Sequence, residues 1–308
     1  MSIAGQGATL SEFELRPRRA GELLDVAFRL TKHVIRTMWP VMLVVLVPVS
    51  ALAALQIVSV SDAATSDDFA TAANSSGQSG LSFLSTAVVG LLLTALIPAM
   101  YAAHMGSPIS SSDALRHGLK RMPMAIVYAI LAFIGFVIIL IPAFFGVALI
   151  FFAVFAVARV AGIIGVIVVG GLFYIGLIVG FLGLAGRFQV GFVSLVLEDI
   201  GPFEALKRGF ALTKRRWLQF GALSTLLFVL TFIVVLVAAG IGAAVRSSVE
   251  GSVGVGLVAF VGYLLYLGIW IPLYAALGLA LYVDSRVRDE ALDLGQLSSQ
   301  LSSPTLLG

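Results

Sequence analysis

One stretch constrains the fold of this chain more than any other feature: between residues 124 and 186, Arg159 is the only charged side chain. A run of about 20 apolar residues already crosses the ~30 Å hydrocarbon core of a bilayer, and this stretch is much longer. Apolar runs of spanning length recur along the chain, at 38–60, 81–104, 217–245 and 253–283. We therefore expect an all-α, polytopic membrane protein, and this excludes a soluble enzyme.

The placement of lysine and arginine decides whether 124–186 holds two spans or three. Two spans, at 124–152 and 163–186, leave only Arg159 and Arg246 of the 19 Lys and Arg residues on the outer side. A third span would carry the basic residues of 207–216 across the membrane, against the rule that positive charge stays in the cytoplasm. The sequence thus predicts six spans in the inner (plasma) membrane, with both termini cytoplasmic.

The regions outside the spans are short, so we expect residues 1–308 to form a single membrane domain. The segment at 61–80 is small, polar and acidic, and it predicts a flexible outer loop. The tail at 295–308 is expected to be disordered.

Three basic amphipathic segments precede the first, third and fifth spans, and we name them the elbow segments. Each places apolar and charged side chains on opposite sides at helical spacing. The apolar sides are expected to be Leu23, Val26, Leu30 and Val34 in the first, Leu115, Leu119 and Met122 in the second, and Phe203, Leu206, Phe210 and Trp217 in the third. Pro123 is expected to end the second segment. The pattern predicts three helices lying at the cytoplasmic membrane surface.

The elbow segments recur at a constant interval, because Glu22, Asp113 and Glu204 are each 91 residues apart. DALRHGL at 113–119 aligns with EALKRGF at 204–210, which contains Arg208, and FRLTK at 28–32 aligns with FALTK at 210–214, which ends on Lys214. One elbow plus two spans then forms a repeat, at 17–104, 108–186 and 199–290, always in the same orientation. The alternative is that unrelated amphipathic segments converge on similar strings.

Three motifs in order carry a family resemblance: RPRRAGELLDVAFRL at 16–30, LVLEDIGPFEALKRGFALTKRRW at 195–217 and LYVDSRVRDEALDL at 281–294. They resemble the bacterial glycerophosphoryl diester phosphodiesterase membrane-domain family over most of the chain. In some relatives this domain is fused to a soluble catalytic barrel, and the spans leave no room here for its ~250 residues. The resemblance implies a stand-alone accessory membrane protein, without catalytic, cofactor-binding or metal-binding residues.

Charged side chains beside the spans are the remaining candidates for a site, because charge is costly there. Arg187 and Glu198 fall on one face of a single helix and are candidates for lining a cavity or contacting lipid. The alternative is that Arg187 reaches the headgroups while 188–197 lies at the interface.

A second group of charges follows the last span, with Asp284 and Arg288 at helical i,i+4 spacing, and likewise Arg286 and Glu290. This spacing predicts local ion pairs that stabilise a helix end. The alternative is a contact surface for a protein partner.

Two functions remain on this evidence. The first is a non-catalytic accessory or scaffold component of a membrane-associated machinery, whose basic elbows face anionic headgroups. The alternative is a transporter or flippase-like protein with a cavity near Arg187. No nucleic-acid partner is expected, because the chain has no soluble basic domain. Gly176 and Gly180 are expected to let the fourth span approach a neighbouring helix closely.

Overall fold

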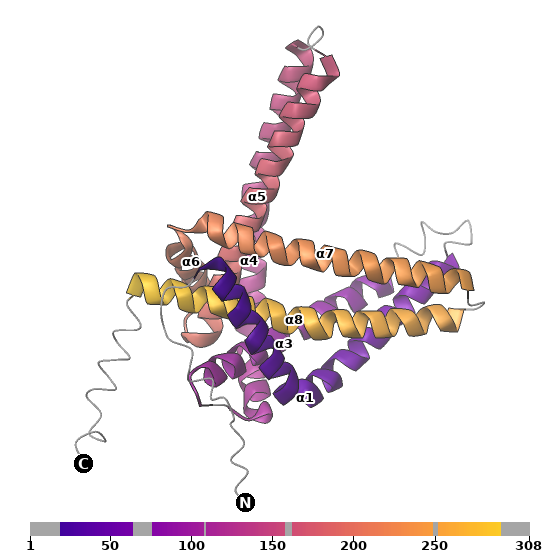
Figure 1. Cartoon of the computed structure of the whole chain (residues 1–308), viewed down its shortest axis with the longest axis vertical. Helices are drawn as coiled ribbons and strands as arrows, with labels where there is room; N and C mark the ends of the chain where they lie inside the picture. Colours follow the sequence, from indigo (N-terminus) through magenta and orange to yellow (C-terminus); the bar gives the residue numbers. More distant parts are fainter. Residues whose placement is uncertain (1–18, 64–75, 108, 158–161, 249–251, 291–308) are drawn as a thin grey trace, which may run out of the picture. The chain divides into compact units, whose positions relative to one another are not determined.

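The computed structural model describes residues 19–63, 76–107, 109–157, 162–248 and 252–290, and every regular element in these ranges is an α-helix (Figure 1). The helices are α1 (Ala20–Ala63), α3 (Ser76–His104), α4 (Ser111–Val157), α5 (Gly162–Leu197), α6 (Pro202–Thr213), α7 (Trp217–Ser248) and α8 (Ser252–Glu290). The predicted all-α class is confirmed for these residues.

Five helices in the described ranges are long and apolar enough to cross a membrane. Their apolar portions are Ala20–Leu55, Thr86–His104, Ser111–Ile139, Trp217–Val234 and Gly256–Glu290. The chain therefore has the make-up of a multi-pass membrane protein. Two helices, α4 and α5, cover the apolar stretch at 124–186. In α5, the segment apolar enough to count is Gly183–Leu197, and it is shorter than a membrane span. The sixth crossing therefore stays a prediction.

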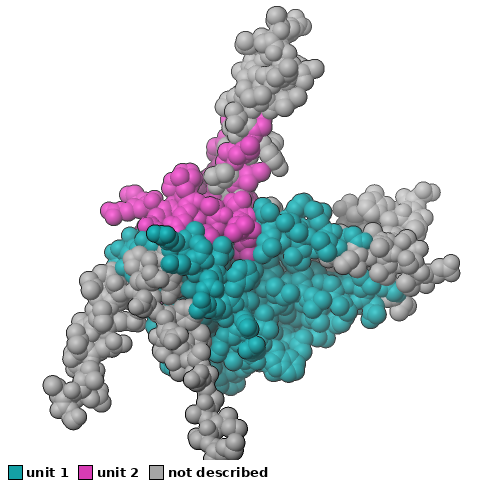
Figure 2. Space-filling view, in the orientation of Figure 1, with its two compact units in different colours: residues 1–123, 229–308 teal, residues 124–228 magenta. Residues whose placement is uncertain are grey.

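The chain divides into two compact units (Figure 2). Unit 1 comprises residues 1–123 and 229–308, and unit 2 comprises 124–228. In unit 1, α1 packs extensively along α8, and α3 contacts both helices. In unit 2, α5 packs against α6. The boundaries fall inside α4 and α7, so each of these helices contributes to both units.

The first two elbow segments are not separate helices. Residues 20–36 and 111–122 are the N-terminal parts of α1 and α4, and the end predicted at Pro123 is wrong because α4 continues through it. A proline removes one backbone hydrogen bond, and long membrane helices tolerate that loss. The third elbow segment is the separate helix α6, followed by a turn at 214–216.

The predicted outer loop is shorter than expected, since α1 extends to Ala63 and α3 begins at Ser76. Helix therefore covers both ends of 61–80. The middle of that loop and the tail at 295–308 lie outside the described residues.

Glu22, Asp113 and Glu204, the acids spaced 91 residues apart, are each the third residue of a helix. Glu22 accepts a hydrogen bond from the backbone N–H of Arg19 at 3.2 Å. Asp113 donates its backbone N–H to the hydroxyl of Ser110 at 3.2 Å, which caps the start of α4. Glu204 follows Pro202, the first residue of α6. An acid is favourable at each position because a helix N-terminus carries partial positive charge.

The three segments also bury equivalent positions. The residues directly after the acids, Leu23, Ala114 and Ala205, are each 0% exposed. Four residues further on, Ala27, Gly118 and Gly209 are buried as well. The three segments thus share one buried face in the same register.

The buried face is the predicted apolar side in the first segment. In the second and third segments it differs from the predicted side. In the first segment, Leu23, Val26, Leu30 and Val34 are buried as expected. In the second and third, Leu119 is 53% exposed and Phe203 is 58% exposed, while alanine and glycine form the buried side. Small residues take that side because they allow two helix backbones to approach closely.

Candidate functional site

The crossing of α5 and α6 in unit 2 is built on two glycines. A Cβ atom placed on Gly209 would lie 2.5 Å from the carbonyl oxygen of Arg187 and 2.8 Å from the Cα of Gly191. No side chain fits between the two helices at this point. The backbone of α6 is therefore in direct contact with the backbone of α5.

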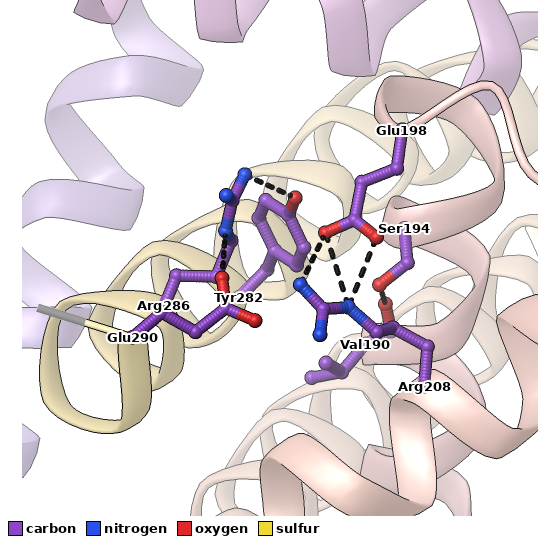
Figure 3. Close-up of polar contacts among 7 residues, drawn as sticks. All are labelled: Val190, Ser194, Glu198, Arg208, Tyr282, Arg286 and Glu290. Carbon is purple, nitrogen blue, oxygen red and sulfur yellow. Dashed lines mark hydrogen bonds and ion pairs between the residues drawn. The ribbon is translucent and has the colours of Figure 1, made fainter. Parts of the chain in front are cut away.

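Next to the crossing, an ion pair links α6 to Glu198, the residue directly after α5 (Figure 3). The Nε of Arg208 in α6 donates to the Oε2 of Glu198 at 3.0 Å, and its Nη2 donates to Oε1 at 3.2 Å. Both side chains are partly buried, with 32% of Arg208 and 16% of Glu198 exposed. Two parallel bonds fix the angle of the guanidinium group as well as its distance. The short connection after α5 is thus held against α6.

Arg187 lies on α5 and contacts α6 through its cation. Its guanidinium carbon lies over the ring of Phe210, 5.3 Å from the ring centre. Phe210 packs edge-on against Phe188, with ring centres 5.9 Å apart. The side chain as a whole is half-buried, and its Nε is buried without a hydrogen-bond partner. The sequence predicts that Arg187 and Glu198 act together. In the structure they contact different residues of α6, Phe210 and Arg208. A cavity between Arg187 and Glu198 stays a prediction.

Tyr128 supports this arrangement and was missed by the sequence reasoning. Its hydroxyl donates to the carbonyl oxygen of Phe188 at 2.7 Å, and its ring lies in a core with Ala125, Leu195 and Ala205. The available signal was a tyrosine inside an apolar run, where its hydroxyl needs a partner. Further along α5, the hydroxyl of Ser194 donates to the carbonyl of Val190 at 3.1 Å (Figure 3).

A related crossing joins the second elbow segment to α3 within unit 1. A Cβ atom on Gly118 would lie 2.9 Å from the backbone nitrogen of Ala95. The hydroxyl of Thr94 donates to the carbonyl oxygen of Gly118 at 3.3 Å. The second elbow segment therefore packs on the preceding long helix, as α6 packs on α5.

The glycines that permit close approach are not the ones predicted. A Cβ atom on Gly176 or Gly180 would meet nothing within 4 Å, so the described structure brings no neighbouring helix against them. The close crossings use Gly118, Gly191 and Gly209 instead. The spacing of two glycines in a sequence does not show which of them faces another helix.

The end of α8, in unit 1, holds the second group of candidate residues (Figure 3). Arg288 donates to Asp284 at 2.9 Å, and Asp284 is only 4% exposed. Arg286 donates to Glu290 at 2.7 Å and to the hydroxyl of Tyr282 at 3.1 Å. The predicted i,i+4 ion pairs are confirmed.

The remaining elbow residues lie at the surface of the described structure. Glu204 and Lys214 are exposed, and Lys207 places its ammonium group 4.7 Å from the ring centre of Phe203. Within the described ranges, no three histidine, aspartate or glutamate side chains gather into a possible metal site.

These features define a class: over its described residues, an all-helical protein with several membrane-length helices, in which the second and third elbow segments pack on long helices through small residues. No family model, curated protein or solved structure matches this chain. The resemblance to the glycerophosphoryl diester phosphodiesterase membrane-domain family therefore stays a prediction.

Proposed function

We propose that this chain is a non-catalytic integral membrane protein that serves as an accessory or scaffold component of a membrane-associated machinery. Six spans, cytoplasmic termini and three repeats at 17–104, 108–186 and 199–290 belong to the proposal. The elbow segments then lie together on the cytoplasmic face of the inner membrane.

The exposed faces of the elbow segments carry this proposal. Each exposes a large apolar side chain beside a cation: Phe28 with Arg29, Leu119 with Lys120, and Phe203 with Lys207. At a membrane surface the apolar group of such a pair enters the lipid and the cation meets the headgroups. Each cation near an anionic leaflet contributes about 1 kcal/mol. The elbows are suited to hold the protein against the cytoplasmic leaflet.

The end of α8 is the proposed contact for a protein partner. Its arginines are held in fixed positions by neighbouring carboxylates, and a fifth to a quarter of each side chain is exposed, 21% for Arg288 and 25% for Arg286. A rigid, partly exposed pair of cations suits an acidic partner surface, because little side-chain entropy is lost on binding. The resemblance to stand-alone membrane domains agrees with an accessory role.

Affinity purification in mild detergent from the native host, followed by mass spectrometry, tests this function. We expect a stoichiometric protein partner that is lost when Arg286→Gln and Arg288→Gln are combined. Arg36→Gln is the matched control, because it removes an exposed cation from α1 in the same unit. A chain that purifies alone, or a partner retained equally by all variants, would contradict the accessory role.

A transporter or flippase-like protein is the second candidate, and the half-buried Arg187 favours it. A charge kept beside a membrane span often marks a pathway for a solute. Reconstituted protein that moves a labelled phospholipid or small anion across vesicle bilayers, with the movement lost in Arg187→Ala, would establish this candidate. Vesicles without such movement would exclude it for the solutes assayed.

A further inference from the structure

We propose that Arg187 binds a single phosphate group, supplied by a phospholipid headgroup of the cytoplasmic leaflet or by free phosphate. The proposal goes beyond the accessory function, because it needs neither a protein partner nor transport. It concerns unit 2 alone.

The first observation is an unsatisfied charge. The Nε of Arg187 is buried and has no hydrogen-bond partner. Two other arginines of the unit have hydrogen-bond partners: Arg208 bonds Glu198, and Arg216 donates to the side chain of Gln219 at 3.0 Å. A charged donor that is shielded from water and left unpaired is costly, so the position favours an anion that restores the bond.

The second observation is that Arg187 is held in place before any ligand binds. Its backbone carbonyl touches α6 at Gly209, and its cation lies over the ring of Phe210. Attraction to a ring face uses none of the guanidinium N–H donors. Because the side chain is half-buried and not fully enclosed, part of the guanidinium group remains within reach of a ligand at the surface, next to the buried Nε.

The third observation is a second unsatisfied donor, on the helix that packs against the residue before Arg187. The Oγ of Ser224 in α7 is buried without a partner and lies 3.1 Å from a Cβ placed on Gly186, the residue before Arg187. The adjacent Thr225 instead donates to the carbonyl of Gly221 at 2.6 Å, as hydroxyls in helices commonly do. The Nε–H of Arg187 and the hydroxyl of Ser224 are thus two donors without partners, and a phosphate offers several acceptor oxygens.

The chemistry of the group selects phosphate. Guanidinium recognises planar pairs of oxygens through two parallel bonds, which both carboxylate and phosphate offer. The nearby carboxylate, Glu198, is already bound by Arg208. The exposed cations Lys214 and Arg215 follow in the turn after α6, and phosphate is the anionic group that phospholipid headgroups present to such cations.

Native mass spectrometry of the full chain in detergent tests the proposal with three probes: phosphatidylglycerol, diacylglycerol with the same acyl chains, and inorganic phosphate. We expect one phosphatidylglycerol per wild-type chain and diacylglycerol binding weaker by about tenfold or more, the loss of a charge-assisted bond. Arg187→Gln should weaken phosphatidylglycerol binding by a similar factor. Arg246→Gln, which removes a cation outside the elbow segments that is expected on the outer side of the membrane, should not.

The source of the phosphate follows from the same experiment. Binding of phosphatidylglycerol that depends on Arg187 assigns the headgroup, whereas binding of inorganic phosphate alone that depends on Arg187 assigns free phosphate. Equal wild-type binding of phosphatidylglycerol and diacylglycerol, with no binding of inorganic phosphate, would overturn the proposal. Phosphatidylglycerol binding that stays equal to the wild type in Arg187→Gln would also overturn it, because the elbow cations would then account for the preference. Where Arg187→Gln fails to fold, Arg187→Lys is the second variant: it keeps the charge, lacks the paired donors and should bind phosphatidylglycerol more weakly than the wild type. Lipid and phosphate binding by the purified chain is measured without a protein partner, so failure to find that partner does not change these results.

Discussion

Replacing Gly209 by alanine would place a methyl group against the backbone of α5. The new Cβ atom would lie 2.5 Å from the carbonyl oxygen of Arg187 and 2.8 Å from the Cα of Gly191. Carbon atoms in favourable contact are about 3.5–4.0 Å apart, so α6 would have to move away by about 1 Å. Both contacts are backbone atoms, which no rotamer change can relieve.

The expected cost follows from two opposing effects. Inserting a methyl group into a packed contact costs about 1–3 kcal/mol. Alanine returns about 0.5–1 kcal/mol, because it restricts the unfolded chain more than glycine does. The free energy of unfolding of Gly209→Ala should therefore fall by about 0–2.5 kcal/mol, and the contact with two backbone atoms favours the upper half of that range.

Denaturant unfolding in mixed micelles, followed by circular dichroism, measures this difference. Gly180→Ala is the matched control, since it makes the same change on α5 where a Cβ atom meets nothing within 4 Å. It should be neutral or slightly more stable than the wild type. If Gly209→Ala unfolds at the same denaturant concentration as Gly180→Ala, the close crossing of α5 and α6 is wrong.

Three further changes probe the same region by the same unfolding assay. Tyr128→Phe should lose about 1 kcal/mol, because it removes the bond to the carbonyl of Phe188 and keeps the ring; an unchanged stability would argue against that bond. Asp199 has a φ of 58°, so Asp199→Gly should be more stable than Asp199→Val by about 1–2 kcal/mol, and the reverse order would contradict this backbone conformation. A double-mutant cycle of Glu198→Gln and Arg208→Gln should give a coupling of about 0.5–1 kcal/mol, discounted for partial exposure, whereas additive effects would mean the two side chains do not interact.

The features that depend on neighbouring residues in the chain were predictable from the sequence. Long apolar runs placed the helices, and the ion pair of Asp284 with Arg288 followed from i,i+4 spacing. The interval of 91 residues between Glu22, Asp113 and Glu204 located three helix starts. Each of these patterns is local, so one sequence suffices to read it.

The buried faces of the second and third elbow segments were not predictable by the same reasoning. Burying large apolar residues is the rule for proteins in water, and it predicted Leu119 and Phe203 on the packed side. Lipid is itself apolar, so it gives no preference for hiding these side chains, and close packing selects Gly118 and Gly209 instead. Which face of a helix is buried therefore depends on whether water or lipid surrounds the protein.

The contacts of Arg187 and Glu198 with α6 also escaped prediction, because they form only after the chain reverses between α5 and α6. Glu198 and Arg208 are ten residues apart, a separation that has no fixed geometry until the turn is known. The sequence shows that two opposite charges are present. It does not show which pairs form.

The central claim is that all three elbow segments lie on the cytoplasmic face of the membrane, and cysteine labelling in intact cells tests it most directly. The chain has no cysteine, so each introduced cysteine reports alone. Lys32→Cys, Lys120→Cys and Lys207→Cys should react with a membrane-impermeant maleimide only after permeabilisation, while Arg246→Cys should react in intact cells. Labelling of any of the three elbow cysteines in intact cells would contradict the claim.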